Sequence, residues 1–313
     1  MFTVSILNKI IQNSPKMQFK TKDIGKLLKM TFNGWNDKDP FRQSAVIAYY
    51  AIFSIPGLLV LVISIAGYFF GNESVNQNIL KQISNTMGSE TAIQISEILI
   101  KSTQSKSSFW GSFMGIIILL VGSTAVFVEL QKTLNLIWHV KVIPKKGILT
   151  ILKARLFSFG LILAIAFLLM VSLVVSAGLS SLGSWMRTYT HDYMISLFYV
   201  LHFIISLAVI SILFALMFKI LPDAKIKWKH VWLGSIVTGI LFTIGQTVLA
   251  YYFSTANPAS VYGVAGSVIL ILLWVSYSSM ILFFGAEFTA TYAKVYSGDI
   301  PPTEIAKVDN SKK

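Results

Sequence analysis

The chain has 313 residues, of which 55% are hydrophobic and 12% are charged, and its formal net charge is +13. This apolar fraction is too high for an ordinary soluble domain, and a sequence without cysteine excludes disulfides, thiolate catalysis and Cys-ligated metals. Since no linker rich in Gly, Ser or Pro divides the sequence, we expect a single polytopic unit.

Residues 1–38 are expected to form a cytoplasmic segment that contains an amphipathic helix. Between Lys22 and Trp35, apolar residues recur at helical spacing with lysines between them. This pattern is typical of a helix that lies on a membrane surface, and a packed cytoplasmic helix is the alternative. Asp39 and Pro40 then have the pattern of an N-cap followed by proline at the first helical position, which predicts the start of a helix.

Six long apolar runs occupy the predicted transmembrane domain, residues 39–295. They lie near residues 44–70, 109–130, 156–178, 193–220, 231–253 and 262–284. Each has at least the ~20 apolar residues that a helix needs to cross a bilayer. We therefore predict an all-α membrane protein with six transmembrane helices and interfacial amphipathic helices.

The loops between these runs are alternately rich and poor in Lys and Arg. Of 26 basic residues, eight precede or open the first run, six lie around the second loop, four lie in the fourth and four follow the last run. By the positive-inside rule both termini are cytoplasmic, including a tail over residues 296–313. Because topology accounts for most of the charge, we expect no nucleic-acid partner; the expected partners are anionic lipid headgroups at the cytoplasmic face.

Several features bear on helix packing. Pro56 near the centre of the first run predicts a kink, which could shape a pathway or be merely structural. Small residues four apart, such as Ser235 and Gly239, predict close helix packing within the chain or a homo-oligomer. Gln246 is expected to bridge helices.

Two acids, Glu129 and Glu287, lie inside or at the end of apolar runs. An ionisable group there costs a few kcal/mol unless it is paired or hydrated. Arg42 and Arg155 open the first and third runs at the same predicted membrane level, so a cluster of these four residues is allowed. Such a cluster could gate a pathway or contact a substrate, or it could be a set of structural ion pairs.

Soluble-type catalysis finds no support in the sequence. A zinc HExxH motif, a phosphate-binding GxxxxGK[ST] loop and a GxSxG nucleophile elbow are all absent from it. We therefore expect no enzymatic activity and no cofactor or bound metal.

Motifs spread over residues 40–295 resemble the YihY/virulence factor BrkB family, which was formerly labelled ribonuclease BN. They are AYYAIFSIP at residues 48–56, LNLIW at 134–138, LPDA at 221–224, YGVAGS at 262–267, LLWV at 272–275 and FGAEF at 284–288. The resemblance implies a six-span inner-membrane protein, with links in the family to serum resistance and, for one relative, to export of a lipid precursor. It points to these residues as site candidates: Tyr49, Tyr50, Pro56, Glu129, Asn135 and Glu287.

Three functions remain open at this point. The first is a transporter or permease for lipid-like or small amphipathic substrates or ions, with Glu129 and Glu287 as gating or coupling groups and Arg42 as their partner. The second is a non-transporting membrane scaffold or envelope-integrity factor that holds partners with its N-terminal helix and C-terminal tail. The third is RNA processing, for which the sequence offers no nuclease-like site.

Overall fold

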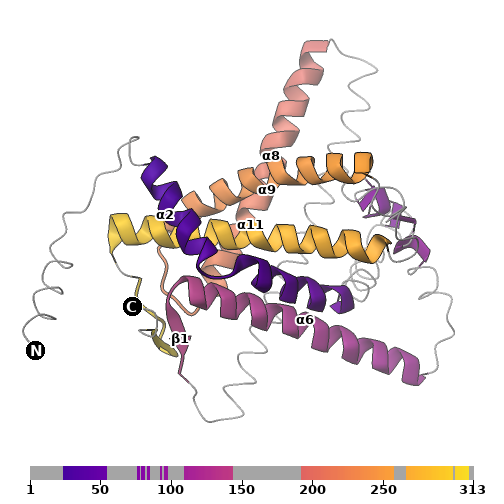
Figure 1. Ribbon diagram of the computed structural model, residues 1–313. Coiled ribbons are helices and arrows are strands. Elements are labelled where there is room, and N and C mark those ends of the chain that lie inside the picture. The colour runs from indigo at the N-terminus through magenta and orange to yellow at the C-terminus, as the bar shows by residue number, and fades with distance from the viewer. Residues whose placement is uncertain are drawn as a thin grey trace, which may run out of the picture.

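The computed structural model (Figure 1) describes residues 24–54, 109–143, 192–256, 266–298 and 300–309, together with short helical pieces between residues 76 and 97. This part of the chain is mostly helical. Its elements are α2 (Ile24–Asn36), a helix over residues 40–54 without a label, α6 (Phe109–Ile137), β1 (Val140–Val142), α8 (Asp192–Ile220), α9 (Trp228–Ala256), α11 (Gly266–Ser297) and β2 (Ala306–Val308).

Four of the six predicted apolar runs coincide with long helices, namely α6, α8, α9 and α11. Three of these helices contain stretches that are long and apolar enough to cross a membrane: Phe203–Ile220, Trp228–Phe253 and Val268–Ser297. The predicted run at 156–178, Arg155 and the kink at Pro56 lie outside the described residues. Two of the helices extend beyond the predicted runs at their C-terminal ends, since α6 continues to Ile137 and α11 continues to Ser297.

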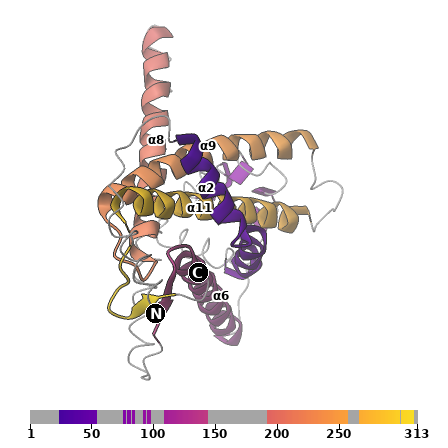
Figure 2. The same cartoon turned by 60° about the vertical axis from the view of Figure 1, so that its left-hand side comes forward.

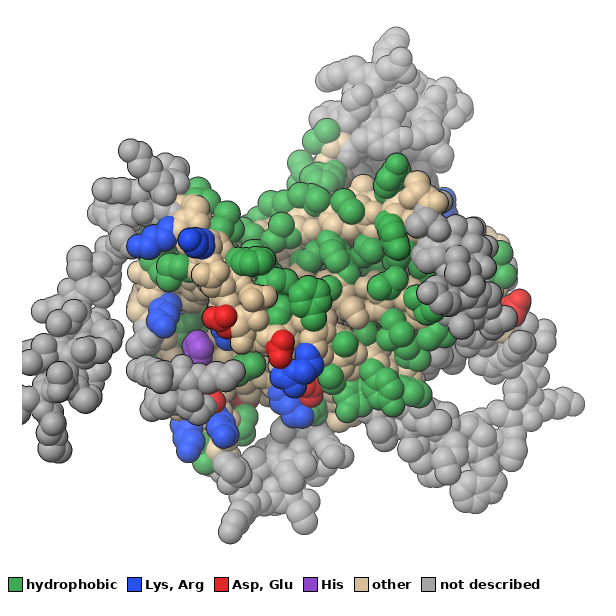
Figure 3. All heavy atoms as spheres, viewed as in Figure 1, with side chains coloured by type: hydrophobic (Ala, Val, Ile, Leu, Met, Phe, Trp, Pro, Cys, Tyr) green, Lys and Arg blue, Asp and Glu red, His purple; other side chains and the backbone are tan. Residues whose placement is uncertain are grey.

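Helices α9 and α11 run antiparallel and side by side, and α6 lies along α11 (Figure 1). Helix α2 crosses α11 near its C-terminal end, while the N-terminal half of α8 projects beyond the other helices (Figure 2). Charged side chains gather mostly around α2, the C-terminal turns of α6 and α11, the α8–α9 loop and β1–β2 (Figure 3). We call this region the charged end.

The main core lies at the charged end. It is built by side chains from the helix over residues 40–54, from α6, α8, α9 and α11, from the two strands and from the α8–α9 loop: Ile47, Leu130, Leu134, Ile137, Trp138, Val140, Phe214, Ala215, Phe218, Leu221, Ala224, Ile226, Val231, Leu282, Phe283, Ala286 and Ala306. Trp138 is buried in this core beside Phe218. The hydrophobic effect drives apolar side chains together only where water is the alternative environment. A core at the charged end of the helices fits this requirement.

Helices α9 and α11 pack through two matching Gly-x-x-x-Thr steps. A Cβ on Gly234 would meet the Thr289 hydroxyl, and a Cβ on Gly285 would meet the Thr238 hydroxyl. Each threonine donates its hydroxyl to the carbonyl of the glycine four residues earlier in its own helix, at 2.6 Å in α9 and 2.7 Å in α11. Close approach of two backbones through small residues is the usual way that membrane helices associate.

A different face of α9 packs against α8. The position of a Cβ on Gly239 lies 2.7 Å from the Ser211 hydroxyl, and Ser235 is fully buried. The predicted small-residue pair Ser235 and Gly239 therefore serves packing within the chain.

A two-stranded antiparallel ribbon follows α6, with Val140 opposite Val308 and Val142 opposite Ala306. His139 has a φ of 52°, a left-handed conformation that ends α6 and turns the chain into β1. Residues 300–309 bond to their own chain: β2 pairs with β1, and the Lys225 amide donates to the Pro301 carbonyl at 2.8 Å. The short strands carried no alternating pattern long enough to be recognised in the sequence.

Helix α2 confirms the predicted amphipathic helix. Leu27 and Thr31 are buried on the side that packs on α11, whereas an adjacent apolar edge, formed by Ile24, Leu28 and Phe32, is exposed. The helix therefore packs on the protein through one side, and contact of its exposed apolar edge with a membrane stays a prediction. After α2, Asp39 has a φ of 56° and its carbonyl accepts the Gln43 amide at 3.1 Å, so the predicted N-cap before Pro40 is confirmed.

Candidate functional site

The candidate site is an ion pair between Lys38 and Glu287 at the charged end. The ammonium Nζ of Lys38 lies 2.9 Å from the Glu287 Oε2 atom, and their side chains are only 12% and 7% exposed. Lys38 also donates to the Gly34 carbonyl at 3.1 Å, which fixes the lysine against the last turn of α2. The pair therefore joins the turn after α2 to the interior of α11.

Gly34 makes room for the carboxylate. A Cβ at this position would collide with the Glu287 Oε1 atom, so any larger residue would displace the carboxylate or tilt α2. Trp35, the next residue, donates its indole N–H to the Met280 carbonyl of α11 at 3.2 Å. Together these contacts hold α2 against α11 on both sides of the ion pair.

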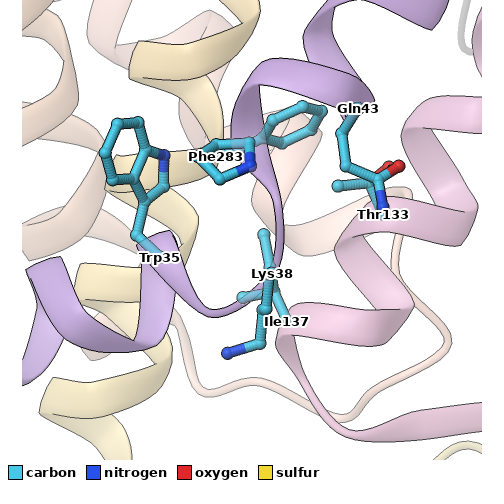
Figure 4. Close-up of a pocket in the computed structure, with 7 residues that line it drawn as sticks. Trp35, Lys38, Gln43, Thr133, Ile137 and Phe283 are labelled. Atoms are coloured by element: carbon cyan, nitrogen blue, oxygen red, sulfur yellow. The ribbon is translucent and has the colours of Figure 1, made fainter.

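A small pocket lies beside the ion pair, and Figure 4 shows lining side chains from α2, the turn that follows it, the helix over residues 40–54, α6 and α11. Its lining residues are Trp35, Lys38, Pro40, Gln43, Thr133, Ile137 and Phe283. On one wall the Thr133 hydroxyl donates to the Gln43 side-chain oxygen at 3.1 Å, which joins the helix over residues 40–54 to α6. The lysine of the ion pair is thus also a wall of the pocket.

A second buried polar cluster centres on Asp223 in the α8–α9 loop. Its Oδ2 atom accepts hydrogen bonds from the side-chain amides of Asn135 at 2.8 Å and Gln131 at 3.1 Å. Its own amide donates to the Asn135 Oδ1 atom at 2.8 Å, and its carbonyl accepts the Thr303 amide at 3.0 Å. Asp223 therefore ties α6, the α8–α9 loop and the C-terminal residues together.

The predicted grouping of acids with Arg42 does not form among the described residues. Arg42 instead lies 3.4 Å from Asp39, and both side chains are at least 70% exposed. Glu129 lies 3.2 Å from Lys132, one turn further along α6. The reason is geometric. Arg42 is on an exposed side of its helix, whereas the Lys38 side chain is buried and reaches Glu287.

The remaining predicted residues lie in different places. Asn135 is in the Asp223 cluster. Tyr49 is exposed and its ring meets those of Tyr50 and Phe53 edge-on, at 5.6 and 5.3 Å. Gln246 is half-buried on α9, next to Gly245, where the Tyr277 hydroxyl occupies the space of a Cβ.

Lys38 and Asp223 were not among the predicted site residues. Asp223 lies in the LPDA motif, and its acid so near an apolar run was a usable indication. Lys38 gave no such indication, because its partner is 249 residues away in the sequence. Within the described part of the chain, no three His, Asp or Glu side chains come together as a metal site would require.

Comparisons with known proteins agree with this architecture. Residues 31–308 match the family described as Virulence factor BrkB. A UPF0761 membrane protein of Saccharophagus degradans is 25% identical over 272 residues, which cover 87% of this chain and 60% of the relative. One from Tolumonas auensis is 22% identical over 262 residues, 82% of each chain.

Another UPF0761 membrane protein, from Histophilus somni, is 25% identical over 204 residues, 64% of this chain and 68% of the relative. No solved structure matches the chain. The long apolar helices and these relatives define a helical membrane protein. The chain belongs to the Virulence factor BrkB family, as the resemblance predicted.

Proposed function

We propose that this protein is a permease of the bacterial inner membrane for lipid-like or small amphipathic substrates or ions, with six spans and both termini in the cytoplasm. The observation that carries the proposal is the buried ion pair of Lys38 with Glu287 beside the pocket at the charged end. The gathering of basic side chains at this end supports its assignment to the cytoplasmic side. The proposal assigns no catalytic chemistry to the chain.

The ion pair acts as a latch in this proposal. While it is closed, Lys38 and Trp35 hold α2 across α11, and the pocket stays small. Opening the latch exposes two charges to water or to a charged substrate group, which replaces the lost partner. Breaking a buried pair without replacement costs about 3–5 kcal/mol, and about 3 kcal/mol corresponds to a factor of roughly 150 in a closed–open equilibrium.

Purified protein in liposomes tests this proposal. The probes are an NBD-labelled phospholipid, whose movement between leaflets is read with dithionite, and a trapped pH dye read under an imposed potential. We expect wild-type protein to move one of them, Lys38→Met and Glu287→Gln to raise the basal rate, and the charge swap K38E/E287K to return it toward wild type. The matched control is Lys29→Gln, an exposed lysine of α2. Movement of neither probe by wild type and variants would refute a permease for lipids or protons.

A non-transporting scaffold is the second candidate, favoured by the exposed apolar edge of α2 at Ile24, Leu28 and Phe32. Residues 300–309 give it less support than the sequence did, because they bond to their own chain. Crosslinking from an exposed α2 position in cells separates the two candidates. Recovery of one partner in fixed stoichiometry would favour the scaffold. A lipid distribution between the two leaflets that differs between cells with and without the protein would favour the permease.

A further inference from the structure

Helix α9 carries a long exposed apolar face that ends in two tryptophans. The face winds along the helix at four-residue spacing: Trp228, Trp232, Ile236, Ile240, Ile244 and Val248 are all exposed. At 1.5 Å per residue it is about 30 Å long, which matches the hydrocarbon thickness of a bilayer. Two exposed tyrosines, Tyr251 and Tyr252, follow its far end. The face thus has the length and the aromatic ends of a surface in contact with lipid.

The two tryptophans form a fixed pair at the charged end. Their ring centroids are 6.4 Å apart, and the residues are 47% and 43% exposed. Lys219 holds Trp228 in place, because its ammonium lies 5.7 Å from the indole centroid and also donates to the Ile226 carbonyl across the loop. The tryptophan pair is therefore held against the protein while still reaching the surroundings.

Three exposed lysines lie within three residues of Trp228 in the sequence, namely Lys225, Lys227 and Lys229. Residues 224–233 contain no acid, and the nearby Asp223 is buried with its carboxylate bonded to two amides. The positive charge is thus not neutralised within the loop. It lies at the level where an adjacent leaflet would place its phosphates if the apolar face contacts acyl chains.

We propose that this surface binds an anionic phospholipid of the adjacent leaflet. The lysines contact the headgroup phosphate, the tryptophan pair lies at the glycerol level, and the acyl chains follow the apolar face toward Val248. Charge complementarity selects an anionic over a zwitterionic lipid. The surface is separate from the latch at Lys38 and Glu287, so failure of the permease proposal would leave this one standing.

The test uses the full chain in vesicles that contain brominated phosphatidylglycerol or brominated phosphatidylcholine, which quench tryptophan on contact. The quenching that belongs to this surface is the difference between the quenching of wild type and that of W228F/W232F, which lacks the two tryptophans. We expect stronger quenching by phosphatidylglycerol, with a preference of about fivefold per contacting lysine at most. The variant K225Q/K227Q/K229Q should lose this preference, while K225R/K227R/K229R should keep it. The matched control K26Q/K29Q, on the exposed side of α2, should also keep it.

Equal quenching by the two brominated lipids in wild type would overturn the proposal. So would loss of preference in the arginine variant or in the α2 control, because the effect would then not depend on charge at this loop. Inorganic phosphate at matched ionic strength provides a further arm. If it abolishes the preference and chloride does not, the lysines bind a free anion and the assignment to a lipid is wrong.

Discussion

Replacing Lys38 by methionine should destabilise the protein far more than an ordinary lysine substitution, because the carboxylate of Glu287 would lose its partner while remaining buried. The pair is 2.9 Å apart and its side chains are 12% and 7% exposed. Removing one member of such a pair costs about 3–5 kcal/mol. The Lys38 contact to the Gly34 carbonyl, at 3.1 Å, would be lost as well.

A double-mutant cycle separates the coupling free energy of Lys38 and Glu287 from the other effects of each substitution. We expect Lys38→Met and Glu287→Leu each to cost several kcal/mol, and the double variant to cost much less than their sum, because two apolar side chains leave no unpaired charge. The control cycle uses Arg42 and Asp39, an exposed pair 3.4 Å apart, for which the coupling should be at most about 1 kcal/mol.

The assay is equilibrium unfolding in mixed micelles, with the free energy of unfolding obtained by titrating a denaturing detergent. Circular dichroism follows the helix content, which should be unchanged in the folded baseline of every variant. The reasoning fails if Lys38→Met costs no more than Arg42→Met, or if the coupling in the two cycles is equal. In either case the charges would not be buried together, and the latch would lose its basis.

Three further results are expected. Gly285→Ala should cost about 1–3 kcal/mol in the same titration, because the new Cβ meets a hydroxyl of α9, whereas Gly25→Ala, with open space around it, should be neutral or slightly stabilising. Asn135→Ala leaves the buried Asp223 carboxylate with one amide donor in place of two; it should cost about 1–3 kcal/mol and speed amide exchange over residues 300–309, which a purely local effect would leave unchanged. Trp35→Phe removes the 3.2 Å bond to α11 and should cost about 1 kcal/mol, and an unchanged free energy would mean that this bond does not hold α2.

The elements that could be predicted from sequence are those encoded locally. Apolar runs gave α8, α9 and α11, the 3.6-residue pattern gave α2, and the Asp39–Pro40 pair gave the start of the next helix. Each of these depends on residues that are neighbours in the chain. Helix ends were less predictable: α11 continues past Glu287, and Ala286, which belongs to the core at the charged end, and Phe288 are both buried beyond the apolar run.

The partners of the buried acids could not be predicted, because they depend on how distant segments pack. The sequence predicted that Glu287 needs a partner or water, and the partner it suggested was Arg42, which opens the first apolar run. The helix over residues 40–54 begins only after a turn. Lys38, in that turn, is buried against Glu287, whereas Arg42, in the helix, is exposed to solvent. A difference of four residues on one side of a turn therefore decides which cation is buried.

The two buried acids, Asp223 and Glu287, differ in which parts of the chain supply their partners. Asp223 satisfies its carboxylate with amides alone and holds residues 300–309 through Thr303, so its bonds stay within one folded unit of loop, ribbon and α6. Among the described residues, Glu287 is instead paired with Lys38, a cation in the turn that follows a separate helix, α2, whose apolar edge is exposed. In the permease proposal, Glu287 is therefore the buried acid whose partner would move, because that partner comes from outside the helix bundle. This asymmetry is why we assign the moving part to α2 and the fixed part to the Asp223 cluster.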